Sequence, residues 1–259
     1  MRPNTGFKLG NHMPLSHSDD LYWLAGGTKM VPTATAPAMA FVNEHSRLLD
    51  FALFATQAFL DKANASIGVE NSSDGSDDND EMLQELILTR TVDNFLCFLS
   101  DLLALIYKTK PQMLRSSEQE RLDFVLNFES MDELRAAVAE KKVERLSYLG
   151  LRDLNDSLRG QMGFELFGSP KDLNEAAVLV EMRNICVHAR GVVGATSARR
   201  FAEFKDLLGK RLDFSHERIR ACRKFLENAV FDIDVRATEK FSLPCCKVPK
   251  PPSHLIGGE

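Results

Sequence analysis

The segment of this sequence with the clearest chemical potential is Arg183-Asn184-Ile185-Cys186-Val187-His188. Histidine titrates near neutral pH, so His188 can take a proton from a ribose 2′-hydroxyl or give one to a leaving 5′-oxygen. Arg183 offers a planar fork of donors to the charge that builds up on a phosphate in the transition state. Asn184 can orient either the phosphate or the imidazole. These residue types predict a site that cleaves RNA without a metal ion.

The spacing of the three side chains limits how they can act together. At about 100° per residue, Asn184 and His188 stand one turn apart on the same face of a helix. Arg183 points about 140° away from His188. The two meet only if this edge of the helix lines a cleft, or if a second copy of the chain completes the site. A pair five residues apart also arises by chance in many helices, so a helical scaffold with an accidental motif is an alternative.

Charge is distributed unevenly along the chain. The formal net charge is −5, which argues against a general nucleic-acid coat protein. Residues 183–224 nevertheless carry eleven Lys or Arg against four acids, a net charge of +7, which can neutralise several phosphates. We expect Arg190, Arg199 and Arg200 to bind RNA, the alternative being a solvated helix face. Residues 70–85 hold seven acids and no Lys or Arg.

The elements that must position the motif are helices. Apolar residues recur at helical spacing through most of the chain, with Leu83, Leu86 and Ile87 opening the buried stripe of the second long helix. Pro111 ends that helix, and Ser215 is an expected N-cap for the last one. No series of strands is predicted. The expected helices cover residues 38–65, 82–108, 117–128, 132–149, 151–163, 171–190, 197–210 and 217–233 or beyond.

The chain divides into three parts by composition. Residues 1–37 are rich in Gly, Pro, Ser, Thr and Asn and predict an irregular arm, with Trp23 as a contact to the core. Residues 38–241 form the helical domain, interrupted by a flexible acidic loop at 68–80. Residues 242–259 contain four prolines and predict a loosely ordered tail. The expected fold class is all-α, an irregular helical bundle.

Several other polar residues are expected to have structural roles. Asp232 and Asp234 are interpreted as solvated acids at a helix end, and His45 as a surface or half-buried histidine. Arg90 and Asp93 either support the cleft beside the motif or belong to a polar stripe. The five cysteines form no CxxC pair and are read as reduced thiols of a cytoplasmic protein. No cofactor, secretory signal or membrane span is expected.

The motif and the helical layout resemble the HEPN superfamily, whose signature is Arg-x(4–6)-His with a polar residue after the arginine. Residues 183–193, Arg-Asn-Ile-Cys-Val-His-Ala-Arg-Gly-Val-Val, are similar to the RNxxVHxRGxV version found in prokaryotic conflict systems. Residues 209–215, Gly-Lys-Arg-Leu-Asp-Phe-Ser, are also similar to members of that group. The resemblance spans roughly residues 83–241 in helical layout, but its specific motif is confined to these short segments.

The resemblance implies a bundle of HEPN type that forms a two-fold dimer, with both copies of the motif meeting in a composite cleft. Active members are metal-independent endoribonucleases that leave a 2′,3′-cyclic phosphate and a 5′-hydroxyl. Arg183 would then bind the phosphate, His188 would act as acid or base, Asn184 would assist, and Cys186 would pack. The implied role is a toxin or antiviral effector, with an antitoxin or regulatory protein as a further partner. Many members do not cut RNA, so a non-catalytic module that binds a protein, nucleotide or RNA is the alternative.

Overall fold

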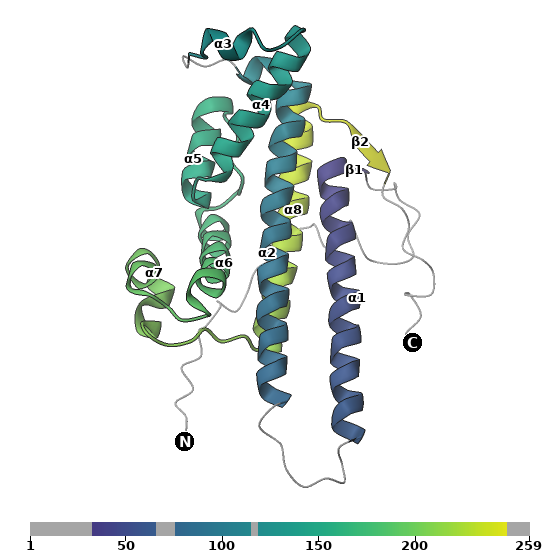
Figure 1. The fold of residues 1–259 in the computed structure, drawn as a ribbon, viewed down its shortest axis with the longest axis vertical. Helices are drawn as coiled ribbons and strands as arrows, with labels where there is room; N and C mark the ends of the chain where they lie inside the picture. The colour runs from purple at the N-terminus through teal and green to yellow at the C-terminus, as the bar shows by residue number, and fades with distance from the viewer. Residues whose placement is uncertain (1–32, 66–75, 115–118, 248–259) are drawn as a thin grey trace.

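The protein is built of helices packed around one long central helix. The computed structural model describes residues 33–65, 76–114 and 119–247. Helix α2 (Ser76–Thr109) contacts α1 (Ala36–Ala65), α4 (Met131–Ser147), α6 (Pro170–Ala189) and α8 (His216–Phe241). Figure 1 shows α1 and α2 side by side as a long hairpin, with α8 next to α2. The expected all-α class is confirmed.

Helix α2 occupies the centre because it carries a broad apolar stripe. Each fully buried Val, Leu, Ile or Phe side chain stabilises the fold by roughly 1.5–3 kcal/mol relative to an exposed one. Leu86 departs from the expected stripe, because it is 57% exposed while Leu83 and Ile87 are buried. The buried apolar positions of α2 are Leu83, Ile87, Leu88, Val92, Phe95, Phe98, Leu99, Leu102, Leu103, Ile106 and Tyr107.

The two long helices begin earlier than the sequence pattern predicts. Helix α1 starts at Ala36, where the Ala38 amide donates a hydrogen bond to Thr35 Oγ1 (3.4 Å). Helix α2 starts at Ser76, so residues 76–80 are helical rather than part of the predicted acidic loop. The remainder of that predicted loop, 68–75, lies outside the described residues.

The predicted helix at 117–128 is much shorter in the structure. A 3-10 turn, η1 (Pro111–Leu114), follows α2, and α3 covers only Leu122–Val125. Helix α3 buries none of its residues, so no tertiary packing lengthens it. Helix α5 (Leu151–Met162) ends at Gly163, whose φ of +62° is the left-handed conformation that glycine adopts without strain.

The predicted helix at 197–210 is broken into two pieces. Helix α7 (Ala195–Arg200) and the 3-10 helix η2 (Ala202–Leu207) are separated by Phe201, whose backbone is extended. Phe201 and Phe204 are both buried and meet edge to face at 5.7 Å between ring centroids. The helix is thus interrupted at a residue whose ring packs in the core.

A two-stranded ladder ties the first and last described segments together. Strand β1 (Thr33–Thr35) pairs antiparallel with β2 (Cys245–Lys247), although no strands were predicted. The Thr35 amide donates to Asp234 Oδ2 (3.1 Å), and the Thr35 hydroxyl donates to Asp234 Oδ1. Asp234 is therefore a buried anchor on α8, 2% exposed, and its interpretation as a solvated acid was wrong. Trp23 and the rest of residues 1–32 lie outside the described part.

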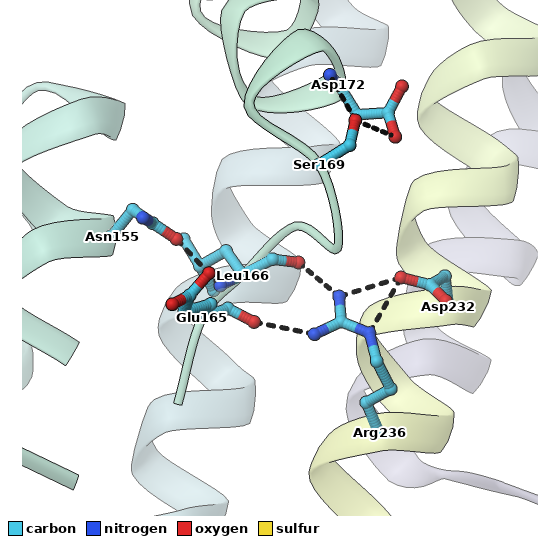
Figure 2. Close-up of polar contacts among 7 residues, drawn as sticks. All are labelled: Asn155, Glu165, Leu166, Ser169, Asp172, Asp232 and Arg236. Atoms are coloured by element: carbon cyan, nitrogen blue, oxygen red, sulfur yellow. Dashed lines mark hydrogen bonds and ion pairs between the residues drawn. The ribbon is translucent and has the colours of Figure 1, made fainter. Parts of the chain in front are cut away.

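Arg236 of α8 fixes the loop that leads into α6 (Figure 2). Its guanidinium donates to the carbonyl oxygens of Glu165 (2.6 Å) and Leu166 (2.5 Å), and its Nε donates to Asp232 (2.8 Å). From α5, the buried Asn155 side chain accepts a hydrogen bond from the Leu166 amide (2.9 Å). The loop is thereby attached to two helices, which sets where α6 begins.

None of the described helices combines the length and the apolar character that crossing a bilayer requires.

Candidate functional site

Helix α6 carries the Arg183–His188 motif in its last two turns. Ser169 caps the helix, because its Oγ accepts a hydrogen bond from the Asp172 amide (3.1 Å) and donates one to the Asp172 carboxylate (2.8 Å; Figure 2). The residues that α6 buries are Ala176, Ala177, Val178, Leu179, Met182, Ile185 and Cys186. This packing leaves Arg183 and Asn184 half-buried at the edge and exposes the whole stretch 187–190.

Arg183 is held by an ion pair with α2. Its Nε donates to Asp93 Oδ1 at 2.7 Å, and its Nη1 donates to Asn184 Oδ1 at 3.2 Å. The Arg183 and Asp93 side chains are 26% and 29% exposed, so the pair lies at the surface but is shielded from much of the solvent. Of the two α2 residues expected beside the motif, Asp93 thus contacts it. Arg90 instead pairs with Glu44 of α1.

His188 lies on the exposed end of α6, away from the Arg183 guanidinium. In the described part of the chain it forms no hydrogen bond or ion pair. One copy of the protein therefore joins Arg183 to Asn184 by a hydrogen bond but forms none between His188 and either residue. For Arg183 and His188 this agrees with their separation of about 140° around the helix.

Cys186 points into the core beside the motif. It is 7% exposed, and burial raises the pKa of its thiol to about 12, with Glu85 adding to the effect. A thiol with this pKa stays protonated at neutral pH and is a poor nucleophile. Its interpretation as a packing residue is confirmed.

The three arginines expected to bind RNA are exposed on the connection between α6 and α8, residues 190–215. Arg190 ends α6 in the left-handed conformation, with φ of +53°. Arg199 donates only to the Ala195 carbonyl oxygen of its own helix (3.3 Å), and the Arg200 guanidinium lies 5.8 Å from the Phe201 ring centroid. Within the described ranges, none of the three pairs with a carboxylate. Their charges are available to an anionic partner.

Sequence reasoning missed the contacts that attach this connection to α2. The Arg211 guanidinium forms ion pairs with Glu81 (2.9 Å) and Glu85 (2.8 Å), and His216 Nε2 lies 2.8 Å from Asp80 Oδ2. The acids of α2 at positions 81 and 85 share one face, which was a usable signal. The pattern did not indicate which of the many cations in 183–224 would meet them.

Backbone hydrogen bonds fix the start and the end of the same connection against each other. The Val193 amide donates to the Lys210 carbonyl (3.0 Å), and the Leu212 amide donates to the Gly191 carbonyl (2.9 Å). Gly191 has φ of +76°, and a Cβ there would lie 3.4 Å from the Arg211 side chain. The residues directly after the motif are therefore held close to Arg211 and, through it, to α2.

Over residues 33–65, 76–114 and 119–247, no group of three or more His, Cys, Asp or Glu side chains is arranged to hold a metal ion.

Comparison of the chain with protein-family models, with curated protein sequences and with solved structures finds no match.

Proposed function

We propose that this protein is an endoribonuclease of HEPN type that acts as a homodimer, with Arg183 and His188 contributed to a composite site by both copies. The observation that carries the proposal is the state of Arg183. Asp93 accepts a hydrogen bond from its Nε and Asn184 accepts one from its Nη1, so the guanidinium is held in place, while no described residue accepts a hydrogen bond from its Nη2. A phosphate is recognised by such a terminal edge.

The proposed reaction uses the 2′-hydroxyl of the RNA as the nucleophile. One His188 imidazole takes the proton of that hydroxyl, the 2′-oxygen attacks the phosphorus, and the 5′-oxygen leaves with a proton from an acid in the site. The products are a 2′,3′-cyclic phosphate and a 5′-hydroxyl. Arg183 stabilises the charge on the phosphate, and Asn184 keeps the guanidinium in place.

A second copy supplies what one chain lacks. Arg183 and His188 form no hydrogen bond within one copy, and a two-fold axis at the end of α6 would bring the arginine of one copy to the histidine of the other. The exposed Arg190, Arg199 and Arg200 support RNA as the substrate, because their charges are not neutralised by carboxylates in the described part. A role as a cytoplasmic toxin or antiviral effector, restrained by an antitoxin or regulatory protein, belongs to the same proposal.

The Arg183–Asp93 contact also favours a second candidate function. A half-buried ion pair that ties α6 to α2 is what a structural arginine makes, which suits a non-catalytic HEPN module that binds a protein, nucleotide or RNA. In that case Arg183 contributes to stability and His188 has no chemical role.

Cleavage of labelled RNA by the purified protein in the presence of a chelator separates the two candidates. We expect RNA fragments with 5′-hydroxyl ends and, for His188→Ala, a loss of roughly 10²–10⁴-fold in rate. The matched control is His216→Ala, which removes another exposed histidine. Intact RNA with the wild type, together with a lower unfolding temperature for Arg183→Ala, would favour the non-catalytic module. Equal cleavage by His188→Ala would refute the proposed chemistry.

A further inference from the structure

Two exposed guanidinium groups from different helices meet on one buried aromatic ring. Arg152, in the first turn of α5, has its Cζ 4.8 Å from the Phe201 ring centroid, and Arg200, the last residue of α7, has its Cζ 5.8 Å from the same centroid. Phe201 is 5% exposed and packs edge to face on the buried Phe204, so its ring is a fixed support. We call Arg152 and Arg200 the arginine pair.

Arg152 is also oriented by hydrogen bonds that cross three elements. Its Nη2 donates to Asn174 Oδ1 in α6, and Asn174 Nδ2 donates to Glu203 Oε1 in η2 at 2.7 Å. No described residue accepts a hydrogen bond from Nε or Nη1 of Arg152, or from any guanidinium nitrogen of Arg200. The ring contact and the hydrogen bond thus hold Arg152 in one orientation and leave an edge of its guanidinium for a ligand.

The carboxylates near the arginine pair form no ion pair with it. A Cβ at Gly150 would lie 3.8 Å from Arg200 Nη2 and 3.7 Å from Asp153 Oδ2, yet Asp153 and Arg200 are not within ion-pair distance of each other. Glu203 accepts its hydrogen bond from Asn174 rather than from either arginine. An anion that bridges the two guanidiniums therefore breaks no ion pair among the described residues, and it gains planar, charge-assisted contacts.

The arginine pair lies well away from the candidate site. Asn174, which holds Arg152, and His188 are fourteen positions apart on α6, which corresponds to about 21 Å along a helix. A stacked nucleic-acid strand advances about 3.4 Å per phosphate, so roughly six nucleotides cover this distance. An RNA strand of ordinary length can reach both regions at once.

We propose that the arginine pair binds backbone phosphates of RNA about six nucleotides from the bond that is cleaved. The proposal rests on the endoribonuclease function for the identity of its ligand, and it adds a contact region outside the reacting groups. The net charge of +7 over residues 183–224 favours a polyanion as that ligand. A guanidinium binds a phosphate whatever base it carries, so the arginine pair strengthens binding without selecting a sequence.

Fluorescence anisotropy with the full-length protein tests the proposal. The probe is a labelled RNA of twelve nucleotides with 2′-O-methyl groups, which cannot be cleaved through its 2′-oxygens. Arg152→Gln and Arg200→Gln should each reduce the slope of log affinity against log salt by about 0.7 and raise the Kd roughly fivefold at 0.1 M salt. Arg152→Lys, which keeps the charge, should restore the slope. As a control, Arg159→Gln removes the same charge from α5, but this guanidinium pairs with Glu165, so the Kd should stay within about twofold of the wild type.

A Kd and a salt slope that both glutamine variants share with the wild type, or with Arg159→Gln, would overturn the proposal. Equally tight binding of a polyglutamate peptide of the same charge would also overturn it, because the surface would then suit an acidic protein.

A cleavage assay distinguishes failure of this proposal from failure of the proposed function. With cleavable RNA, Arg152→Gln should raise the KM for the twelve-nucleotide substrate but not for a trinucleotide, which is too short to reach both regions. Weaker binding by the variants, with no cleavage even by the wild type, refutes the nuclease and leaves the arginine pair as an RNA contact. Cleavage with the same KM in Arg152→Gln refutes the arginine pair and leaves the nuclease.

Discussion

His45 should make the stability of this protein depend on pH. The residue is 6% exposed, its ring stacks on Phe41 with 5.6 Å between centroids, and its Nδ1 has no hydrogen-bond partner. Burial lowers its pKa from 6.5 to about 4, and the nearby Arg223 cation adds to the effect. The imidazole is therefore neutral in the folded protein at pH 7.

The sign of the effect follows from the direction of the pKa shift. Because the pKa of His45 is lower in the folded state than in the unfolded chain, the unfolded chain binds the proton first as the pH falls. Stability is fully present above pH 6.5 and is lost as the pH drops towards 4. A shift of this size corresponds to about 3 kcal/mol in total, of which about 2 kcal/mol is lost between pH 7.5 and 5.0.

Urea-induced unfolding, followed by circular dichroism at pH 7.5 and 5.0, measures this loss in a comparison of the wild type with His45→Leu. The buried Asp234 and the half-buried Glu227, whose pKa values burial raises, stabilise the fold as the pH falls and act in both proteins alike. The free energy of unfolding of His45→Leu should therefore rise by about 2 kcal/mol relative to the wild type on going to pH 5.0.

The control is Phe204→Leu, which removes a fully buried ring elsewhere in the core and leaves the contact between His45 and Phe41 unchanged. Its free energy of unfolding should differ from that of the wild type by the same amount at both pH values. Parallel pH dependences for the wild type and His45→Leu would show that the imidazole is as well solvated in the folded state as in the unfolded chain, and would refute the reasoning.

Three further substitutions probe contacts that lie far apart in the sequence. Asp234→Ala leaves the Thr35 amide and hydroxyl without their acceptor and should lower the free energy of unfolding by about 2–4 kcal/mol. Hydrogen exchange at the start of α1 should become faster, and unchanged exchange there would contradict the role of Asp234 as an anchor. Gly191→Ala should cost about 1–2 kcal/mol, because its φ of +76° is strained for a residue with a Cβ. Gly194→Ala, where a Cβ meets open space, is the control. Arg211→Met removes two partly exposed ion pairs with α2 and should lower the free energy of unfolding by about 1 kcal/mol or less at low salt, and by less at high salt. A loss of stability that does not depend on salt would show that packing, not charge, is lost.

The sequence was most informative where the signal is local. The helical period predicted α4, α5, α6 and α8 close to their observed bounds, because the spacing of apolar residues and the caps lie within one segment. The motif was placed at the end of a helix for the same reason, and the angle between Arg183 and His188 followed from the helical repeat alone.

The tertiary structure decided which partners these segments meet. Asp93 was one of two residues that could have contacted the motif, and only the packing of α6 on α2 selects it over Arg90. Thr35 and Asp234 lie 199 positions apart, and no local pattern relates them. Leu86 has the same residue type and spacing as buried leucines, yet it is exposed because no described element covers that side of α2.

What the sequence by itself determined is therefore the set of helices and the order of polar groups along them. Periodicity and capping act over a few residues and are written in the chain directly. Contacts between residues that are distant in the sequence decide which helix face is covered and which carboxylate pairs with which guanidinium. They also decide whether an acid is solvated or buried. Those contacts form only when the helices pack, so they were decided by the tertiary structure.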